Sequence, residues 1–238
     1  MTVVKQTPSV NYSTHVQDIG WQGYVKDGST AGTTGQSKRL EAIRIKLSNN
    51  TSYKGTIQYQ THIQDIGWQG WKMNDEMSGT SGQSKRLEAI RIKLTGEMAK
   101  QYDIYYRVHS QEFGWLGWAK NGESAGTAGY SYRLEAIEVK LVEKGGKAPG
   151  STQDAYRQRY VSYQTHVQDI GWQGIKYDGE EAGTSGQSKR LEAINISLSN
   201  PLYSGSIEYQ THVQDIGWQG WKANGQMAGT SGQSKRLE

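Results

Sequence analysis

The sequence predicts an all-β protein built from tandem repeats of short antiparallel strands. A Gly-Trp pair recurs at a nearly fixed step, which is the signature of a repeat architecture. The tryptophans of this pair are Trp21, Trp68, Trp115, Trp172 and Trp218. The 238 residues also include 8 Trp, 15 Tyr and 30 Gly, with only 3 Pro and one Phe. This composition favours short strands joined by tight turns over helices.

Each repeat contains at least two segments with the alternation of a half-buried strand. In the second repeat, positions 57, 59, 61 and 63 are Ile, Tyr, Thr and Ile, and the residues between them are Gln, Gln and His. In the first repeat, Ile43, Ile45 and Leu47 would share one face of a closing strand. Turn signals that suit hairpins lie between the two segments. They are Asp27-Gly28, Asn121-Gly122, Asp178-Gly179 and Asn224-Gly225. A third short strand would carry the tryptophans.

A longer period of three repeats overlies the short one. The steps between the tryptophans are 47, 47, 57 and 46 residues, and the openings of repeats one and two resemble those of repeats four and five. We therefore expect a three-repeat module over residues 1–142, a linker over 143–153 and two repeats of a second module over 154–238. The linker segment is rich in Gly, Lys, Pro and Ser. A triplet that closes on itself with pseudo-threefold symmetry accounts best for this period.

A single five-bladed ring is the alternative. The chain stops at Leu237-Glu238, where the other copies continue into Ala-Ile and a closing strand. Either the chain is a piece of a longer array, or the segment at residues 2–5 supplies the missing strand and closes five repeats into a ring, as propellers do.

Bulk composition excludes several classes of protein. The net charge of +4 and pI of 9.0 are mild, and Lys and Arg recur singly, so we expect no nucleic-acid partner. The chain has no cysteine, which excludes disulfides and thiolate metal sites. No stretch approaches the roughly 20 apolar residues of a membrane span. The first residues do not resemble a signal peptide, so an exported protein would be a mature form or a fragment.

A second aromatic position follows the Gly-Trp pair and is the first candidate binding site. It is occupied by Trp71, Trp118 and Trp221, and by Tyr24 and Ile175 in the first repeat of each triplet. A position that accepts Ile, Tyr and Trp lies either at a module edge or at a ligand surface. An exposed indole there would stack on the apolar face of a sugar ring. Both readings stay open.

Polar residues of the first strand and its turn complete the candidate site. The histidines are His15, His62, His109, His166 and His212; the glutamines are Gln22, Gln69, Gln173 and Gln219; the aspartates are Asp18, Asp65, Asp169 and Asp215. Their donors and acceptors suit hydroxyl groups. The alternative is that each histidine only locks a neighbouring loop. One histidine per repeat lacks the companions of a metal site, so we expect no metal and no cofactor.

Two further sets are expected to be structural. The first tryptophans, Trp21, Trp68, Trp115, Trp172 and Trp218, would each be a buried core anchor. Arg39 with Glu41, and Arg86 with Glu88, share strand parity with the apolar row of the closing strand. A charge entering a buried row is costly unless it is paired, so we expect an Arg–Glu pair at the rim of the sheet.

These segments resemble a known family. The residues His-Val-Gln-Asp-Ile-Gly-Trp-Gln-Gly-Trp at 212–221, followed by Ala-Gly-Thr-Ser-Gly-Gln-Ser-Lys-Arg-Leu-Glu at 228–238, are similar to the clostridial hydrophobic repeat with a characteristic tryptophan, the ChW repeat. The likeness covers nearly the whole chain. It implies a secreted or cell-surface protein of Firmicutes and a non-catalytic role in binding polysaccharide, cell wall or other surface components. Repeat three departs from the pattern at Tyr130 and Tyr132.

Repetition itself favours binding over catalysis. Every candidate acid, base and nucleophile is copied, and no Gly-x-Ser-x-Gly, His-Glu-x-x-His or phosphate-loop pattern appears. Several weak sites on one body would raise avidity. We therefore expect no enzyme activity but multivalent binding of cell-wall polysaccharide or a surface glycan. The alternative is a protein–protein adhesion or scaffold module, whose partners would be surface proteins.

Overall fold

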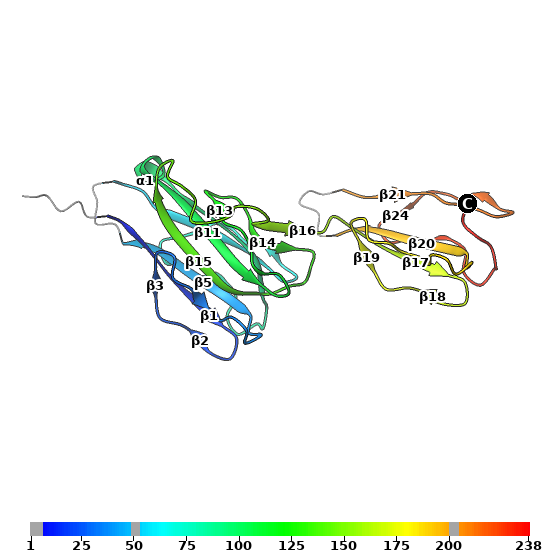
Figure 1. Cartoon of the computed structure of the whole chain (residues 1–238), viewed down its shortest axis with the longest axis horizontal. Coiled ribbons are helices and arrows are strands. Elements are labelled where there is room, and N and C mark those ends of the chain that lie inside the picture. Colours follow the sequence, from blue (N-terminus) through cyan, green and yellow to red (C-terminus); the bar gives the residue numbers. More distant parts are fainter. Residues whose placement is uncertain (1–6, 49–52, 200–204) are drawn as a thin grey trace, which may run out of the picture. The chain divides into compact units, whose positions relative to one another are not determined.

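The structure is a computed structural model that describes residues 7–48, 53–199 and 205–238 (Figure 1). The chain separates into two compact units, residues 1–157 and residues 158–238. The first unit holds three repeats and the second holds two. Strands account for nearly all of the regular structure, with one short helix, α1 (Gly96–Gln101), in the described part of the chain. The prediction of an all-β repeat protein is confirmed.

Each of the first four repeats is built on a hairpin of two long strands. In the first repeat β1 (Ser9–Val16) pairs antiparallel with β5 (Leu40–Ser48), and the short strands β2 (Gly20–Trp21) and β3 (Val25–Lys26) fold back onto β1. The fourth strand, β4 (Ala31–Gly32), leaves its own repeat.

The other repeats follow the same order. The second repeat contains β6 (Ile57–Ile63), β7 (Gly67–Trp68), β8 (Lys72–Met73), β9 (Ser78–Gly79) and β10 (Leu87–Leu94). The third contains β11 (Tyr102–Ser110), β12 (Gly114–Trp115), β13 (Ala119–Lys120), β14 (Ala125–Ala128) and β15 (Leu134–Glu143). The fourth contains β17 (Val161–Val167), β18 (Gly171–Trp172), β19 (Lys176–Tyr177) and β20 (Leu191–Leu198). The fifth contains β21 (Glu208–Tyr209), β22 (His212–Val213), β23 (Gly217–Trp218), β24 (Lys222–Ala223) and β25 (Ala228–Gly229).

The fourth strands close the first three repeats into a ring. Strand β9 of repeat two pairs with β5 of repeat one, β14 of repeat three pairs with β10 of repeat two, and β4 of repeat one pairs with β15 of repeat three. Because the last pairing returns to the start, the cycle is complete after three repeats. The pseudo-threefold module is therefore what the chain forms, and the five-bladed ring is not. The segment at residues 2–5, which that ring would have used, lies outside the described residues.

A glycine allows each of these strand crossings. Gly32 has a φ of +105°, and a Cβ there would lie 2.3 Å from the carbonyl oxygen of Glu135. Gly79 has a φ of +122° and meets the carbonyl oxygen of Glu41 at the same distance. Any side chain at these positions would combine backbone strain with a clash. The glycine of the Gly-Thr-x-Gly segment is thus needed for one repeat to enter the sheet of its neighbour.

Three buried tyrosines tie the repeats together inside the first unit. The hydroxyl of Tyr12 donates to the carbonyl oxygen of Ser29 and accepts from the N–H of Val139 in repeat three, 3.1 Å away. The hydroxyl of Tyr59 likewise accepts from the N–H of Ile45 in repeat one, at 3.2 Å. Burial raises the pKa of Tyr12 to about 12, and it raises the pKa of Tyr59 and Tyr106 as well. The hydroxyls therefore stay protonated and able to donate.

A β-bulge places Glu41 on the opposite face of β5 from the one that the sequence predicted. Val16 pairs with Leu40 and His15 pairs with Ala42, so Glu41 is the extra residue of a bulge. Leu40 and Ile43 are three positions apart and would lie on opposite faces of a regular strand. Because of the bulge, both side chains enter the core. Glu41 consequently shares a face with His15 and not with the apolar row. The predicted parity was wrong because strict alternation does not survive a bulge.

The second unit repeats this arrangement with two repeats. Strand β17 pairs with β20, and β25 of repeat five pairs with β20 of repeat four, as β9 pairs with β5 in the first unit. The shorter strands of repeat five form the pairs β21–β24 and β22–β23. The register of Ala193 against Gly229 matches that of Ala42 against Gly79. The inter-repeat crossing is therefore the same in both units.

Candidate functional site

The centre of each repeat is a glutamate held by a histidine and an arginine, and this glutamate is buried in the first four repeats. In repeat one, Nδ1 of His15 lies 3.1 Å from Oε2 of Glu41, and Nη2 of Arg39 lies 2.7 Å from Oε1. The carboxylate uses one oxygen for each partner. The same contacts join His62 and Arg86 to Glu88, His109 and Arg133 to Glu135, His166 and Arg190 to Glu192, and His212 and Arg236 to Glu238. The predicted Arg–Glu pair is present in every repeat, and the histidine is its third member.

The first tryptophan of each repeat is not the buried core anchor that the sequence suggested. Its indole stands edge-on to the histidine, with ring centroids 5.4 to 5.5 Å apart in all five repeats. In repeats one and two an arginine covers the ring, Arg44 at 4.4 Å and Arg91 at 4.1 Å from the centroid. Asn195 stands at this position in repeat four, and Trp172 is more exposed. The core is filled instead by aliphatic residues and the buried tyrosines.

The second aromatic position is exposed in four repeats and buried in one. Trp71 is 37% exposed, Tyr24 42%, Ile175 53% and Trp221 66%, whereas Trp118 is only 6% exposed. Two of the exposed rings carry a lysine ammonium over one face: Lys93 lies 4.0 Å from Trp71 and Lys46 lies 3.9 Å from Tyr24. Trp118 therefore does not fit the prediction of a ligand-facing aromatic, and the others remain candidates.

The candidate glutamines serve the fold of their own repeat. The side-chain carbonyl oxygen of Gln22 accepts from the N–H of Gly32 at 2.8 Å and from the hydroxyl of Thr14 at 3.1 Å. The corresponding oxygens of Gln69, Gln173 and Gln219 accept from Gly79, Gly183 and Gly229. In repeats one, two and five the glutamine thus braces the loop that crosses into the neighbouring repeat. The prediction that they face a ligand is not supported by this placement.

The candidate aspartates lie at the surface in tight turns. Asp18 has a φ of +60°, and its carboxylate lies 3.1 Å from Nζ of Lys38. The same exposed pair joins Asp65 to Lys85, Asp169 to Lys189 and Asp215 to Lys235. Within the described residues no group of three or more His, Asp or Glu side chains is placed to hold a metal ion. The charged side chains of the candidate site are therefore held in pairs with one another.

The motif that contains these residues matches the family model for Clostridial hydrophobic W, abbreviated ChW, at residues 15–49, 62–96, 109–143, 166–200 and 212–238. These five matches span well over half of the chain. The chain belongs to the ChW family. No curated protein and no solved structure matches it. Among the described helices of this ChW protein, none is long and apolar enough to cross a membrane.

The third ChW repeat departs from the others where the glutamine brace should be. Leu116 takes the place of the glutamine, and the N–H of Gly126 donates instead to the carbonyl oxygen of Ala155, at 2.9 Å. The N–H of Trp118 donates to the carbonyl oxygen of Ser151, at 2.8 Å. The segment expected to be a linker at 143–153 therefore packs on repeat three, and β16 (Tyr156–Gln158) extends the sheet beside β14. This packing is why Trp118 is buried.

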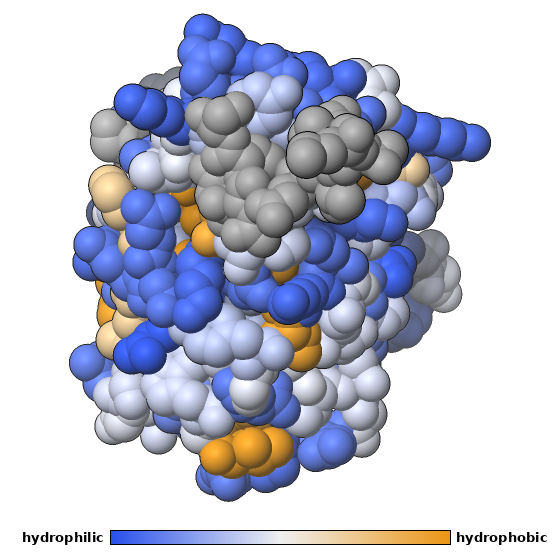
Figure 2. Space-filling view, turned by 90° about the vertical axis from the view of Figure 1, so that its left-hand side faces the viewer, coloured by the Kyte–Doolittle hydropathy of each residue, from blue (hydrophilic) through white to orange (hydrophobic). Residues whose placement is uncertain are grey.

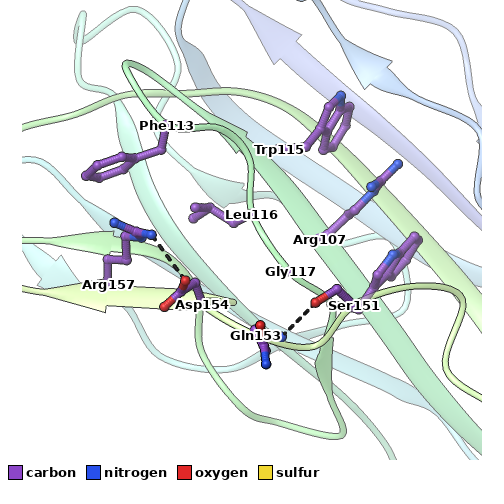
Figure 3. A pocket seen from close by; sticks show the side chains of 10 residues that line it. Arg107, Phe113, Trp115, Leu116, Gly117, Ser151, Gln153, Asp154 and Arg157 are labelled. Atoms are coloured by element: carbon purple, nitrogen blue, oxygen red, sulfur yellow. Dashed lines mark hydrogen bonds and ion pairs between the residues drawn. The ribbon is translucent and has the colours of Figure 1, made fainter.

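A pocket of about 340 Å³ lies beside this segment. Figure 3 shows Phe113 and Arg157 on one side of it, and Trp115 and Arg107 on the other. The guanidinium of Arg157 stacks on Phe113 at 4.7 Å. Phe113 also packs edge-on against Tyr130 and Tyr132, with centroids 5.2 and 5.4 Å away. The two tyrosines that set repeat three apart in the sequence thus build an aromatic cluster that the other repeats lack.

Restoring the brace should loosen this segment. In Leu116→Gln, the new amide would compete with Ala155 for the N–H of Gly126 and would place a polar group among apolar neighbours. We expect trypsin to cleave after Lys147 and Arg157 about tenfold faster, as the loss of roughly one hydrogen bond implies. Gln69→Leu is the reciprocal control, since it removes a brace in repeat two and should leave the segment protected. Unchanged cleavage and amide exchange at Gly126 in Leu116→Gln would contradict this account.

Proposed function

We propose that this ChW protein is a non-catalytic, multivalent binding module of a secreted or surface protein, and that its ligand is a cell-wall or surface carbohydrate. The observation that supports this best is the second aromatic position. Tyr24, Trp71 and Trp221 present a partly exposed ring at the same place in three repeats. Partly exposed aromatic rings that recur at equivalent positions offer a set of similar surfaces on which a flat ligand can stack.

The chemistry of these rings suits a sugar. An indole offers a flat apolar face to the C–H bonds of a pyranose ring, and its edge meets polar neighbours. The polar groups nearby are already arranged in pairs, so a neutral polyol can exchange hydrogen bonds with them without leaving a bare charge. Several sites on one chain bind a polymer with an avidity that exceeds the affinity of each site. A repeat protein offers several equivalent sites, and a polymeric glycan offers several equivalent sugar units for them to bind.

The test is binding to purified cell walls and to a glycan array, with Trp71→Ala and Trp221→Ala combined. We expect the double variant to bind about tenfold more weakly for each stacking ring removed. Met77→Ala with Met227→Ala is the matched control, because these side chains are exposed and occupy equivalent positions in the same two repeats. A folded wild-type chain that binds neither cell walls nor any glycan would reject the proposal.

A second candidate, an adhesion module for a protein partner, is favoured by one specific feature. The isoleucine before each Gly-Trp is half exposed in four repeats: Ile19, Ile66, Ile170 and Ile216 are 48 to 50% exposed. Yet on the face shown in Figure 2, hydrophobic residues form separate small spots among hydrophilic ones. A protein-binding surface would favour a broader apolar patch. Binding that survives enzymatic deglycosylation of the target but not its proteolysis would select this candidate.

A further inference from the structure

The loop that follows each fourth strand lies against the His–Glu–Arg cluster of the neighbouring repeat. In the second unit, the N–H of Thr230 donates to the carbonyl oxygen of Glu192 at 2.9 Å, and the hydroxyl of Ser231 lies 3.4 Å from Nε2 of His166. Repeat five thereby completes the surroundings of a cluster that belongs to repeat four. We call the region where the two meet the seam.

The seam between repeats four and five contains a pocket of about 370 Å³. This volume lies within the roughly 300–1,000 Å³ of small-molecule sites. Repeat four contributes His166, Asp169, Arg190 and Glu192 to its lining, and repeat five contributes Ser231 and Ser234. Neither repeat forms the pocket alone.

The polar groups of this seam are balanced in charge and mixed in kind. Arg190 is paired with Glu192 at 2.7 Å, and Lys189 is paired with Asp169 at 3.2 Å. Nδ1 of His166 faces Glu192, which leaves Nε2 for the serine side of the pocket. A fixed set of donors and acceptors without a bare charge suits hydroxyl groups, which both donate and accept.

The same seam recurs in the first unit. The N–H of Thr80 donates to the carbonyl oxygen of Glu41 at 2.8 Å, and that of Thr33 donates to Glu135 at 2.9 Å. At four seams the threonine hydroxyl is buried and makes no hydrogen bond within the described residues. These threonines are Thr33, Thr80, Thr127 and Thr230. Buried polar groups are nearly always paired, so a threonine hydroxyl without a protein partner at the same place is a feature that these four seams share.

The residue after this threonine differs among the seams. It is Thr34, Ser81 and Ser231 at three of them, all exposed hydroxyl residues, and the buried Ala128 at the seam between repeats two and three. The histidine is less exposed where the loop of the next repeat lies against it. The side chain of His166 is 16% exposed, whereas that of His212, which has no neighbouring loop among the described residues, is 35% exposed.

We propose that the ligand site is the seam, shared by two successive repeats, and that its ligand is the hydroxyl-bearing edge of a neutral sugar. This proposal rests on the carbohydrate-binding function proposed above and locates the sugar-binding site at the seam. Histidine of one repeat and the serine or threonine hydroxyl of the next bind adjacent sugar hydroxyls. The seam formed by Ala128 lacks the second contact and does not bind.

The test is a triple variant, Thr34→Ala, Ser81→Ala and Ser231→Ala, assayed on immobilised cell-wall polysaccharide. The change is compatible with the fold because repeat three already carries alanine at this position. One lost hydrogen bond weakens each site about five- to tenfold, so avidity over three seams should fall at least 100-fold. The matched control is Gln36→Ala, Gln83→Ala and Gln233→Ala, in the same loops.

The outcomes separate the two proposals. Loss of binding in the triple variant, with the glutamine control unchanged, supports the seam. If the triple variant binds the polysaccharide as well as the wild type does, while the Trp71 and Trp221 double variant fails to bind, the seam proposal is overturned and carbohydrate binding stands. If the folded wild type binds no polysaccharide, both proposals fall. Chemical shifts of the His166 ring on addition of soluble cell-wall oligosaccharide give a direct reading, and their absence would also count against the seam.

Discussion

Replacing Tyr59 by phenylalanine is expected to lower the unfolding free energy of the first unit by about 1–3 kcal/mol. The ring would still fill its place in the core, but the buried N–H of Ile45 would be left unpaired, and the carbonyl oxygen of Glu76, an exposed residue, would lose its hydrogen bond. Each unpaired buried group costs about 1–3 kcal/mol. Urea unfolding gives the free energy. Amide exchange of Ile45 should accelerate in step with it.

The control for this effect exists within the chain. Tyr163 occupies the same position in repeat four, and its hydroxyl donates to the carbonyl oxygen of Glu180 where the side chain is partly exposed. Tyr163→Phe should cost about 1 kcal/mol or less, because water can replace the lost bond. Equal losses in the two variants would mean that the tyrosine hydroxyl does not hold repeats together in the ring.

Asp103→Asn is expected to lower the stability of the first unit by an amount that depends on pH. The carboxylate of Asp103 is buried at the start of β11. It accepts from Nζ of Lys144 at 2.8 Å, from the amide of Asn121 at 2.7 Å and from the N–H of Gly145 at 3.1 Å. Burial alone would raise its pKa, but these hydrogen bonds and that from Lys120 outweigh burial and hold the pKa well below its usual value. Losing the charge should cost about 2–4 kcal/mol at neutral pH.

The direction of the pH dependence follows from the lowered pKa. The unfolded chain protonates this aspartate near pH 3.9 and the folded chain only at lower pH. Its stabilisation is therefore complete above about pH 5 and is lost as pH falls below 4. The stability difference between wild type and Asp103→Asn should be constant from pH 5 to 8 and shrink in acid. Asp154→Asn, at an exposed carboxylate paired with Arg157, is the control and should change the stability at neutral pH by less than about 1 kcal/mol. A gap that persists undiminished at pH 2 would contradict the assignment.

Much of the architecture was readable from the sequence because it depends on local patterns. Alternation at 57–63 predicted a strand with one buried face, and the structure has Ile57, Tyr59 and Ile63 fully buried there. The superperiod of three repeats predicted a closed triplet, which the pairing of β4 with β15 confirms. The Arg–Glu pair was predicted from the cost of placing one charge in a sheet.

The candidate site was less predictable because its parts meet only in the folded chain. Nothing in the order of residues says that Thr230 and Ser231 lie against His166 of the preceding repeat. Gln22 was a candidate ligand contact because its amide offers a donor and an acceptor, but its partner is the N–H of Gly32, ten residues away. The replacement of this glutamine by Leu116 was the signal in the sequence that the segment at 143–153 packs on repeat three. It was readable only once the role of the glutamine was known.

The sequence by itself determined the β-strand content, the number of repeats and the residue types at each turn, because these follow from periodicity, β propensity and the need for glycine at positive φ. The tertiary structure alone decided which repeat each fourth strand joins, which face Glu41 occupies and which aromatics reach the surface. Those features depend on a bulge that shifts the register and on strands that pair across repeats. Such long-range pairings follow from how the whole core is filled and not from any local segment.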